Sequence, residues 1–345
     1  MKKSILKWLN VAGLVAGLAL FIYLIKQTGT DVIAVYLEMM GWGFAAIMAL
    51  SGLRNLVRAA SWYYSIAPEH RRLSFWSLVN VMLAGEAIKY LTATGPFLAE
   101  PAKAAMVRRQ VPLVQGLSSI VVENLIYNLT VIIFMLGGLP ALALMTDVPD
   151  NLKTAGYIIG IGIVIAVLVA WYAIRKRSFI FARLLVSAAR GRNNRLEQAA
   201  SRVRALEENV YSFYEHRSGA FYFIVALNMT AHLINVAEVI LILGLMGLAA
   251  SPLAGFVVEA VTKVINLAFF FVPVRAGVYE SGHAMVIEAL GMTAGAGVAL
   301  AVIRKIRAIA WAGYGLAVLG VMAASDRRAS RSATGLSLSG EGRDH

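Results

Sequence analysis

The sequence predicts an all-α protein, a polytopic helical membrane protein with about eight membrane segments. Hydrophobic residues make up 59% of the 345 residues and charged residues only 15%, and the mean hydropathy is +0.71. So few polar side chains cannot cover a soluble core of this size. The apolar residues also gather into runs close to the roughly 20 residues that a helix needs to cross a bilayer. These observations exclude a soluble globular fold.

Eight apolar runs are long enough to enter the membrane. They cover about residues 8–25, 41–66, 75–94, 113–144, 154–173, 219–247, 252–272 and 284–324. The first run follows three lysines and so resembles a signal peptide, but the flank KQTGTD lacks a small-residue cleavage site. We therefore expect a retained anchor that starts in the cytoplasm.

Basic connections predict the orientation of these segments, because positively charged loops stay on the cytoplasmic side. EHRRLSF at 69–75, the stretch 175–217 and DRRASR at 326–331 are rich in arginine or lysine, whereas KQTGTD and TDVPDN carry one cation or none. We therefore place the three basic stretches and both termini in the cytoplasm.

The stretch LTATGPFLAEPAKAAMVRR, residues 91–109, interrupts an apolar helix at Gly95 and Pro96 and adds charge. If 75–94 crossed the membrane completely, the basic stretch 175–217 would lie outside, against the charge rule. If the chain instead turns back at the interruption, every basic connection lies on the cytoplasmic side. We predict a re-entrant hairpin, which is tolerated only where protein or water surrounds its non-helical backbone.

The second half repeats this arrangement in the opposite orientation. In FFFVPVRAGVYESGHAMVIEALG, Pro273 and Gly277 interrupt the helical pattern, and Arg275 and Glu280 add charge. A shift of 180 residues (280 − 100) places Glu100 over Glu280. Paired interruptions of opposite topology indicate a transporter binding site near the bilayer midplane.

We therefore divide the chain into one transmembrane domain and a tail. The domain, 1–325, has halves at about 41–144 and 219–324, joined by a basic cytoplasmic linker at 174–218. The basic composition of the linker has two interpretations. Either the linker forms amphipathic helices on the inner leaflet, or its positive charge only orients the chain in the membrane. The tail, 326–345, is rich in Ser, Gly and Arg and is expected to be a disordered cytoplasmic segment.

Charged side chains inside the apolar runs cost about 2.5–3.5 kcal/mol each on insertion scales, so they must pair or line a wet interior. They are Arg54, Arg58, Glu86, Lys89, Glu123, Glu238, Lys263 and Arg304. In the run 219–247, polar residues recur every three or four positions and form one helical stripe. The stripe consists of Asn228, His232, Asn235 and Glu238.

Simpler roles are open for several of these residues. Arg54 and Arg58 could snorkel toward the inner headgroups, and Glu238 and Lys263 could form a structural ion pair. His232 is better explained as a hydrogen-bonded packing residue than as a metal ligand, since no second His, Asp or Glu cluster has ligand spacing. The chain has no cysteine and no nucleotide-binding loop. We expect no cofactor, no metal and no nucleic-acid partner.

Three stretches carry a resemblance to a known family. GPFLAEPAKA resembles its P-x-x-x-G-E-x-x-R-A element, SSIVVENLIYNL its S-x-x-x-E-R-x-x-D element, and VPVRAGVYES its P-x-P-G-G-x-G-x-x-E element. The family is that of the lysylphosphatidylglycerol synthase transmembrane, or flippase-like, proteins. The order of these elements and the hydropathy are similar over about residues 5–325.

The resemblance implies functional roles for Pro96, Glu100, Lys103, Glu123, Pro273, Gly277 and Glu280. The chain departs from the family pattern at Asn124, Tyr127 and Arg275-Ala276, which argues against specificity for lysylphosphatidylglycerol itself. Bifunctional members carry a large soluble aminoacyl-transferase domain, whereas this sequence ends 20 residues after position 325 (345 − 325). Synthase activity is therefore not expected.

Together these features predict a bacterial inner-membrane translocase that binds an anionic or lipid-linked headgroup in a midplane cavity. Lys103 and Arg275 are the expected phosphate contacts, followed by Arg304, and glutamates of the same segments hold the cations in place. The candidate binding residues are Arg54, Arg58, Glu86, Lys89, Pro96, Glu100, Lys103, Glu123, Asn124, His232, Asn235, Arg275, Gly277, Glu280 and Arg304.

Two alternatives stay open at this point. One is an enzyme or enzyme subunit that acts on lipid-linked substrates, with Glu100, Glu123 and His283 as acid–base groups. The other is a non-transporting factor in envelope-lipid synthesis. Membrane lipids are the expected partners in each case, together with a second copy of the chain or proteins of envelope synthesis.

Overall fold

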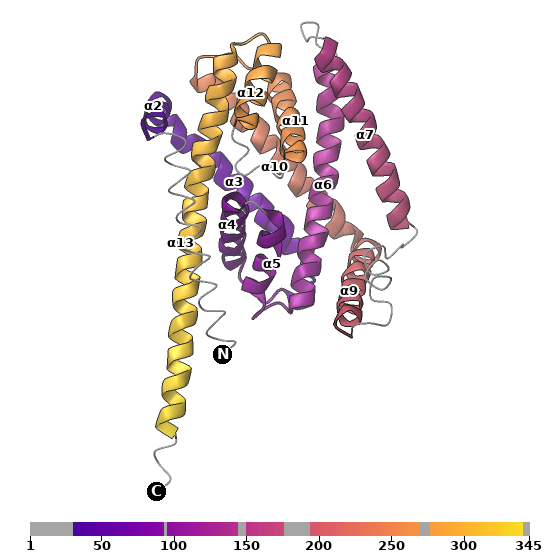
Figure 1. Cartoon of the computed structure of the whole chain (residues 1–345), viewed down its shortest axis with the longest axis vertical. Coiled ribbons are helices and arrows are strands. Elements are labelled where there is room, and N and C mark those ends of the chain that lie inside the picture. The colour runs from indigo at the N-terminus through magenta and orange to yellow at the C-terminus, as the bar shows by residue number, and fades with distance from the viewer. Residues whose placement is uncertain (1–29, 93–94, 144–149, 176–193, 270–276, 341–345) are drawn as a thin grey trace.

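A computed structural model of the chain describes residues 30–92, 95–143, 150–175, 194–269 and 277–340. Within these ranges the chain forms helices and no strands, as the sequence predicts (Figure 1). The elements are α2 (Thr30–Met40), α3 (Gly43–Ser65), the 3-10 turn η1 (Pro68–His70), α4 (Phe75–Leu91), α5 (Pro96–Val107), α6 (Leu113–Ala143), α7 (Asp150–Arg175), α9 (Asn194–His216), α10 (Ser218–Leu245), α11 (Pro252–Ala268), α12 (Val278–Ala289) and α13 (Ala294–Gly340).

Helices α3 and α10 pack against one another over their whole lengths. Their contacts, in order along α3, are Gly43 with Leu245, Arg54 with Asn235, Ser61 with Asn228 and Ser65 with Arg217. Because the α10 numbers fall as the α3 numbers rise, the two helices are antiparallel. The first long helix of each predicted half thus has the opposite orientation to its counterpart.

Each half also contains two short helices that fold back on one another. Helices α4 and α5 have 17 and 12 residues, and α11 and α12 have the same two lengths. All are shorter than the roughly 20 residues of a crossing helix. Lys103 lies over Gly85 in the first pair, and Gly282 lies against Ile265 in the second. The pairs occupy opposite ends of the bundle, with α4 and α5 low and α11 and α12 high in Figure 1.

The first interruption follows the sequence expectation closely. Helix α4 ends at Leu91 and α5 begins at Pro96. Gly95 between them has a φ of 40°, which favours glycine, and proline is well suited to the first turn of a helix. The second interruption includes 270–276, outside the described residues, and α12 starts after Gly277, whose φ is 81°. That these pairs re-enter a membrane stays a prediction.

The first helix of each short pair packs on the long helix of the other half. Helix α4 lies along α13, and α11 lies along α6. The Tyr314 hydroxyl donates a hydrogen bond to Asn80 Oδ1, and Ala260 packs against Phe134. These are equivalent contacts, since 80 + 180 = 260 and 134 + 180 = 314. The two halves are therefore interlocked by an exchange of short helices.

Three described helices are long and apolar enough to cross a membrane. They contain Leu113–Leu142, Ser218–Leu245 and Ala294–Ser325. Ala34–Met40 and Gly43–Ser65 would add a fourth crossing if their 93° bend belongs to one span. In α7 the apolar stretch is shorter, Gly156–Ile165.

The bounds of the eight predicted segments agree with the described helices to different degrees. The runs at 113–144 and 219–247 match α6 and α10. The run at 8–25 lies outside the described residues, so the total of eight stays a prediction.

The predicted segment 284–324 is wrong as a single helix. A turn at 290–293 divides it into α12 and α13. Gly291 adopts a φ of 79°, and Thr293 Oγ1 accepts the backbone N–H of Ala296 at 3.3 Å. The hydropathy pattern does not reveal this turn, because Leu290 and Met292 on either side of Gly291 are apolar.

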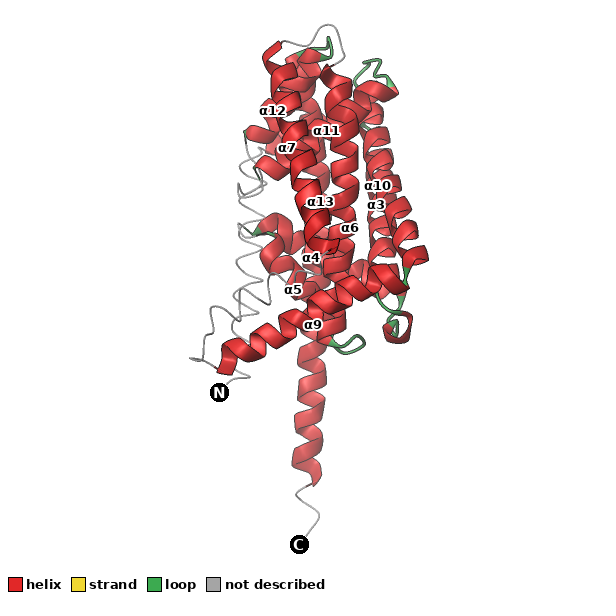
Figure 2. Cartoon of the chain, turned by 90° about the vertical axis from the view of Figure 1, so that its right-hand side faces the viewer, coloured by secondary structure: helices red, strands yellow, loops and turns green. Residues whose placement is uncertain are grey.

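The linker contains a helix, as one of its two interpretations held, and the tail is more helical than its composition suggested. In the linker, α9 lies across the lower end of the bundle (Figure 2), where Asn209 donates a hydrogen bond to Ser118 Oγ at 3.0 Å. Phe213 of α9 packs with Val122 and Ile224. In the tail, expected to be disordered, α13 instead continues to Gly340, over a stretch without proline.

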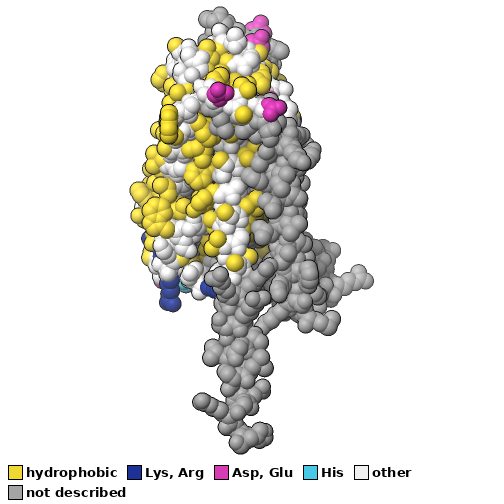
Figure 3. Space-filling model, turned by 90° about the vertical axis from the view of Figure 1, so that its left-hand side faces the viewer, with side chains coloured by type: hydrophobic (Ala, Val, Ile, Leu, Met, Phe, Trp, Pro, Cys, Tyr) yellow, Lys and Arg dark blue, Asp and Glu magenta, His cyan; other side chains and the backbone are white. Residues whose placement is uncertain are grey.

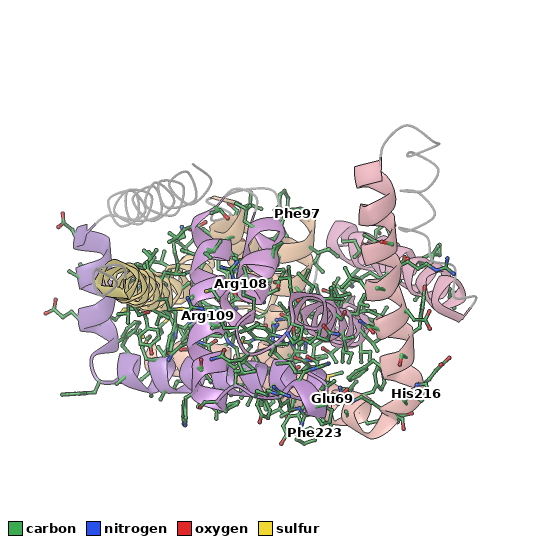
Figure 4. All side chains as sticks on the ribbon, turned by 90° about the horizontal axis from the view of Figure 1, so that it is seen from below. Glu69, Phe97, Arg108, Arg109, His216 and Phe223 are labelled. Atoms are coloured by element: carbon green, nitrogen blue, oxygen red, sulfur yellow. The ribbon has the colours of Figure 1, made fainter. Side chains whose placement is uncertain are left out.

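Charge is distributed unequally between the two ends of the bundle. On the face in Figure 3, apolar side chains cover the wall, Lys and Arg appear at the lower edge, and Asp and Glu appear near the upper edge. Connections at the lower end include Glu69, Arg108 and Arg109, seen from below in Figure 4. The upper connections 246–251 and 290–293 carry no charged residue. By the positive-inside rule the lower end would face the cytoplasm.

Candidate functional site

Buried charged side chains form a network at the centre of the bundle. The side chains of Glu123, Glu238 and Glu259 are only 4%, 0% and 1% exposed. Ionised groups at such depth need partners, because removal from water costs several kcal/mol for each ion. Every one of these glutamates has an arginine or lysine within ion-pair distance.

In the first half, Arg58 of α3 pairs with Glu123 of α6. Their Nη2 and Oε1 atoms are 3.0 Å apart, and the Arg58 guanidinium carbon lies 3.8 Å from the centre of the Tyr127 ring. Ser61 Oγ donates to Glu123 at 3.4 Å and accepts from Asn228 Nδ2 at 3.0 Å. This set of contacts connects α3, α6 and α10.

In the second half, Arg304 of α13 lies between two carboxylates. It is 3.3 Å from Glu238 of α10 and 2.8 Å from Glu259 of α11. Lys263 also pairs with Glu259, at 2.6 Å, and Arg307 pairs with Glu238. Three cations therefore share two carboxylates.

The central ion pairs of the two halves occupy equivalent positions with their charges exchanged. In the first half Arg58 on α3 meets Glu123 on α6, and in the second Glu238 on α10 meets Arg304 on α13. The offsets are 238 − 58 = 180 and 304 − 123 = 181. The halves thus share the ion pair but not the residue type at each position, so a direct sequence comparison does not reveal it.

Arg54 lies between the two halves and has neutral partners. Its Nη1 donates to Asn235 Oδ1 at 3.2 Å and its Nη2 to Asn55 Oδ1 at 2.9 Å. Among the described residues it has no carboxylate within ion-pair distance.

Tyr127 lies where the two halves meet. Its ring centre is 3.8 Å from the Arg58 guanidinium carbon and 5.3 Å from the centre of the His232 ring. Arg58 belongs to the first half, and His232, on α10, to the second. Hydrogen bonds from Arg54 to Asn235 and from Asn228 to Ser61 also connect the polar groups of the two halves.

The first short-helix pair brings two further ion pairs beside this region. Lys89 and Glu86 of α4 are 3.7 Å apart, with side chains 36% and 39% exposed. Lys103 of α5 is 2.5 Å from Glu100 and lies 5.5 Å from the centre of the Trp62 ring. The α4 pair is thus accessible, while Lys103 is enclosed.

The second short-helix pair has its own ion pair at the start of α12. Glu280 Oε2 accepts the backbone N–H of Gly277 at 2.8 Å, and its other oxygen pairs with Lys305 of α13. The carboxylate therefore holds the N-terminus of α12 against α13.

Residues 10–317 match the family model described as the lysylphosphatidylglycerol synthase TM region. The chain belongs to this family. Comparisons with curated proteins and with solved structures gave no match. The resemblance inferred from the three sequence elements is confirmed, and membership is consistent with a role connected with membrane lipids.

In this member of the lysylphosphatidylglycerol synthase TM region family, most of the predicted site residues lie in the central network or on the short-helix pairs. Those in the central network are Arg54, Arg58, Glu123, Asn235 and Arg304. Those on the short-helix pairs are Glu86, Lys89, Pro96, Glu100, Lys103, Gly277 and Glu280. Arg275 lies outside the described residues.

His232 and Asn124 lie on the helices that frame the network. His232 is fully buried, with its Nε2 3.1 Å from Thr130 Oγ1 and its ring against Tyr127 and Phe134. This environment fits the packing role. Asn124 is half-buried on α6. Within the described residues no three His, Asp or Glu side chains are grouped as a metal site would require.

Sequence reasoning left several members of the network out of the site. Glu238 and Lys263 do not pair with one another, as one interpretation held, but with Arg304 and Glu259 respectively. Glu259 and Arg307 were not considered at all. Their spacings were usable signals, because Glu259 with Lys263 is an i,i+4 pair and Arg304 with Arg307 an i,i+3 pair on one helix face.

Proposed function

We propose that this protein moves the polar headgroup of a membrane lipid, or of a lipid-linked intermediate, across a bacterial inner membrane without altering it chemically. The observation that carries this proposal is a buried set of ionic and polar groups supplied by both halves, which meet at Tyr127 and at the Arg54–Asn235 hydrogen bond. Two short-helix pairs lie at opposite ends of the same bundle (Figure 1). Lysylphosphatidylglycerol synthase family membership supports a lipid-related substrate.

The physical problem in lipid translocation is the headgroup. Its charges and hydrogen-bonding groups lose their water in hydrocarbon, whereas the acyl tails never need to leave it. An internal row of cations, carboxylates and amides replaces that water. The partly exposed Glu86 and Lys89 on α4 are available for the first contact.

The interrupted helices provide the geometry for access from two sides. Short helices that break inside the membrane are typical of transporters built from inverted repeats, whose site lies at the repeat interface. In this arrangement, rocking of one half against the other would expose the network first to the basic end and then to the opposite one. The basic end, and both termini with it, would face the cytoplasm.

Cysteine labelling tests this topology, because the chain contains no cysteine. Gln110, just after α5, and Glu288, near the end of α12, are both exposed and belong to the two short-helix pairs. We expect a membrane-impermeant maleimide to label Gln110→Cys only from the cytoplasmic side and Glu288→Cys only from the other side. The parent chain is the control. Labelling of both positions from the same side would rule out the inverted hairpins.

A vesicle assay tests transport itself. The purified chain in vesicles with fluorescent phospholipids should speed headgroup exchange between leaflets, measured with a membrane-impermeant quencher. Glu86→Gln and Lys89→Gln should each lower the exchange rate about tenfold, because each removes one charge-assisted contact with the headgroup. Both side chains are partly exposed, so folding should survive. The control is Glu69→Gln, on the exposed lower connection. Rates equal to those of protein-free vesicles would refute the proposal.

A further inference from the structure

The ionic network contains more cations than anions. Its cations are Arg54, Arg58, Lys89, Lys103, Lys263, Arg304, Lys305 and Arg307, and its carboxylates are Glu86, Glu100, Glu123, Glu238, Glu259 and Glu280. The surplus is two positive charges (8 − 6). A surplus in a low-dielectric interior is unfavourable unless an anion balances it.

Few undescribed segments could supply that anion. Residues 1–29, 93–94, 176–193 and 270–276 contain no aspartate or glutamate, and 270–276 adds Arg275. The acidic residues outside the described ranges lie in the connection between α6 and α7 and in the last five residues of the chain. Within the described residues no carboxylate balances the surplus, and a bound anion would do so.

One of the two surplus charges is Arg54, and the other belongs to the group in which Lys263, Arg304 and Arg307 share Glu238 and Glu259. The only described partners of Arg54 are two amide oxygens, from Asn55 and Asn235, and a guanidinium has more N–H groups than these accept. The Arg54 side chain is partly exposed, whereas Arg304 and Arg307 are buried, so Arg54 is the more accessible cation.

We infer that Arg54 binds an anionic, phosphate-bearing lipid headgroup, and that the site disfavours the cationic lysyl headgroup in the family's name. A guanidinium group can donate two parallel hydrogen bonds to phosphate oxygens, and the N–H groups of Arg54 are not all taken up by its two amide partners. A lysyl ammonium would add a third positive charge to the surplus. The inference rests on the proposed function, since it assigns the headgroup for the same site.

Lipid binding to the full-length chain tests the inference. The protein is placed in phosphatidylcholine nanodiscs, and phosphatidylglycerol, lysylphosphatidylglycerol or inorganic phosphate is added. We expect phosphatidylglycerol alone to raise the unfolding temperature. Native mass spectrometry should show about tenfold more retained phosphatidylglycerol than lysylphosphatidylglycerol, the effect of one strong charge-assisted contact. Equal retention, or a response to inorganic phosphate only, would overturn the assignment.

Substitutions at Arg54 separate binding from folding. Arg54→Gln should abolish the tenfold preference and the temperature shift, while the variant still folds without added lipid, because the Arg54 side chain is partly exposed and has no described carboxylate within ion-pair distance. Arg54→Lys keeps the charge but not the planar fork and should keep only part of the preference. If Arg54→Gln does not fold, the lipid preference of Arg54→Lys tests the inference in its place. Arg108→Gln, on the exposed lower end, is the matched control.

The two readouts distinguish this inference from the proposed function. If vesicles show headgroup exchange but Arg54→Gln keeps the wild-type lipid preference, the inference is wrong and the translocase stands. If the preference depends on Arg54 but no headgroup is exchanged, the anion site stands and the translocase does not.

Discussion

Glu238→Gln is expected to destabilise the folded chain by about 3–5 kcal/mol, the cost of breaking a buried ion pair from one side. Its side chain is fully buried and pairs with both Arg304 and Arg307. Glutamine keeps the shape but removes the charge. Arg307 then has no described carboxylate within ion-pair distance, and Arg304 keeps only Glu259. Unfolding of the purified protein in detergent, by heat or denaturant, measures the loss.

Two further variants test whether the lost charge of Glu238 causes the destabilisation. Glu69→Gln, the same change on an exposed connection, should alter stability by no more than about 0.5 kcal/mol. Adding Arg307→Gln to Glu238→Gln removes one stranded cation and should recover part of the lost stability. If Glu238→Gln is as stable as Glu69→Gln, the central network does not hold the two halves together.

Gly297→Ala should cost about 1–3 kcal/mol through overpacking between α12 and α13. An added methyl group at this position would lie 2.3 Å from the backbone oxygen of His283 and 2.6 Å from the Cα atom of Ala284. These are backbone atoms of a helix, so they cannot rotate away as a side chain would. We expect α12 to shift and to carry Glu280 away from Lys305, which would lower both the unfolding temperature and the transport rate.

Gly320→Ala is the matched control for this change. Gly320 lies on the same helix, and an added methyl group there meets nothing within 4 Å among the described atoms. Alanine is favoured over glycine within a helix by about 1 kcal/mol, so this variant should be neutral or more stable. An equal effect of the two substitutions would mean that α12 does not pack closely on α13 at Gly297.

Much of the fold could be predicted from local features of the chain. Long apolar runs indicated α6 and α10, and Gly95 with Pro96 marked the turn between α4 and α5. These features depend on residues close in sequence. The turn at Gly291 was missed because apolar neighbours hide it from any hydropathy window.

The composition of the site was harder to predict. Glu123 and Arg304 stood out because each is a charge in an apolar run, but their partners Arg58 and Glu259 lie 65 and 45 residues away (123 − 58 and 304 − 259). Arg307 was overlooked beside Arg304 in one short basic group. Side chains that form ion pairs across helices share no local sequence pattern, so only the packing of the helices identifies the partners.

The sequence alone determined that the chain is a membrane protein, where its helices break and which charges must be kept from lipid, because hydrophobic transfer and helix geometry act on neighbouring residues. Only the tertiary structure decided the partner of each charge. It set α3 against α10 in opposite directions, packed α4 on α13 and α11 on α6, and left Arg54 bonded to two amide oxygens with no described carboxylate within ion-pair distance. Ion-pair energies depend on distance in space, and that distance exists only after the helices have packed.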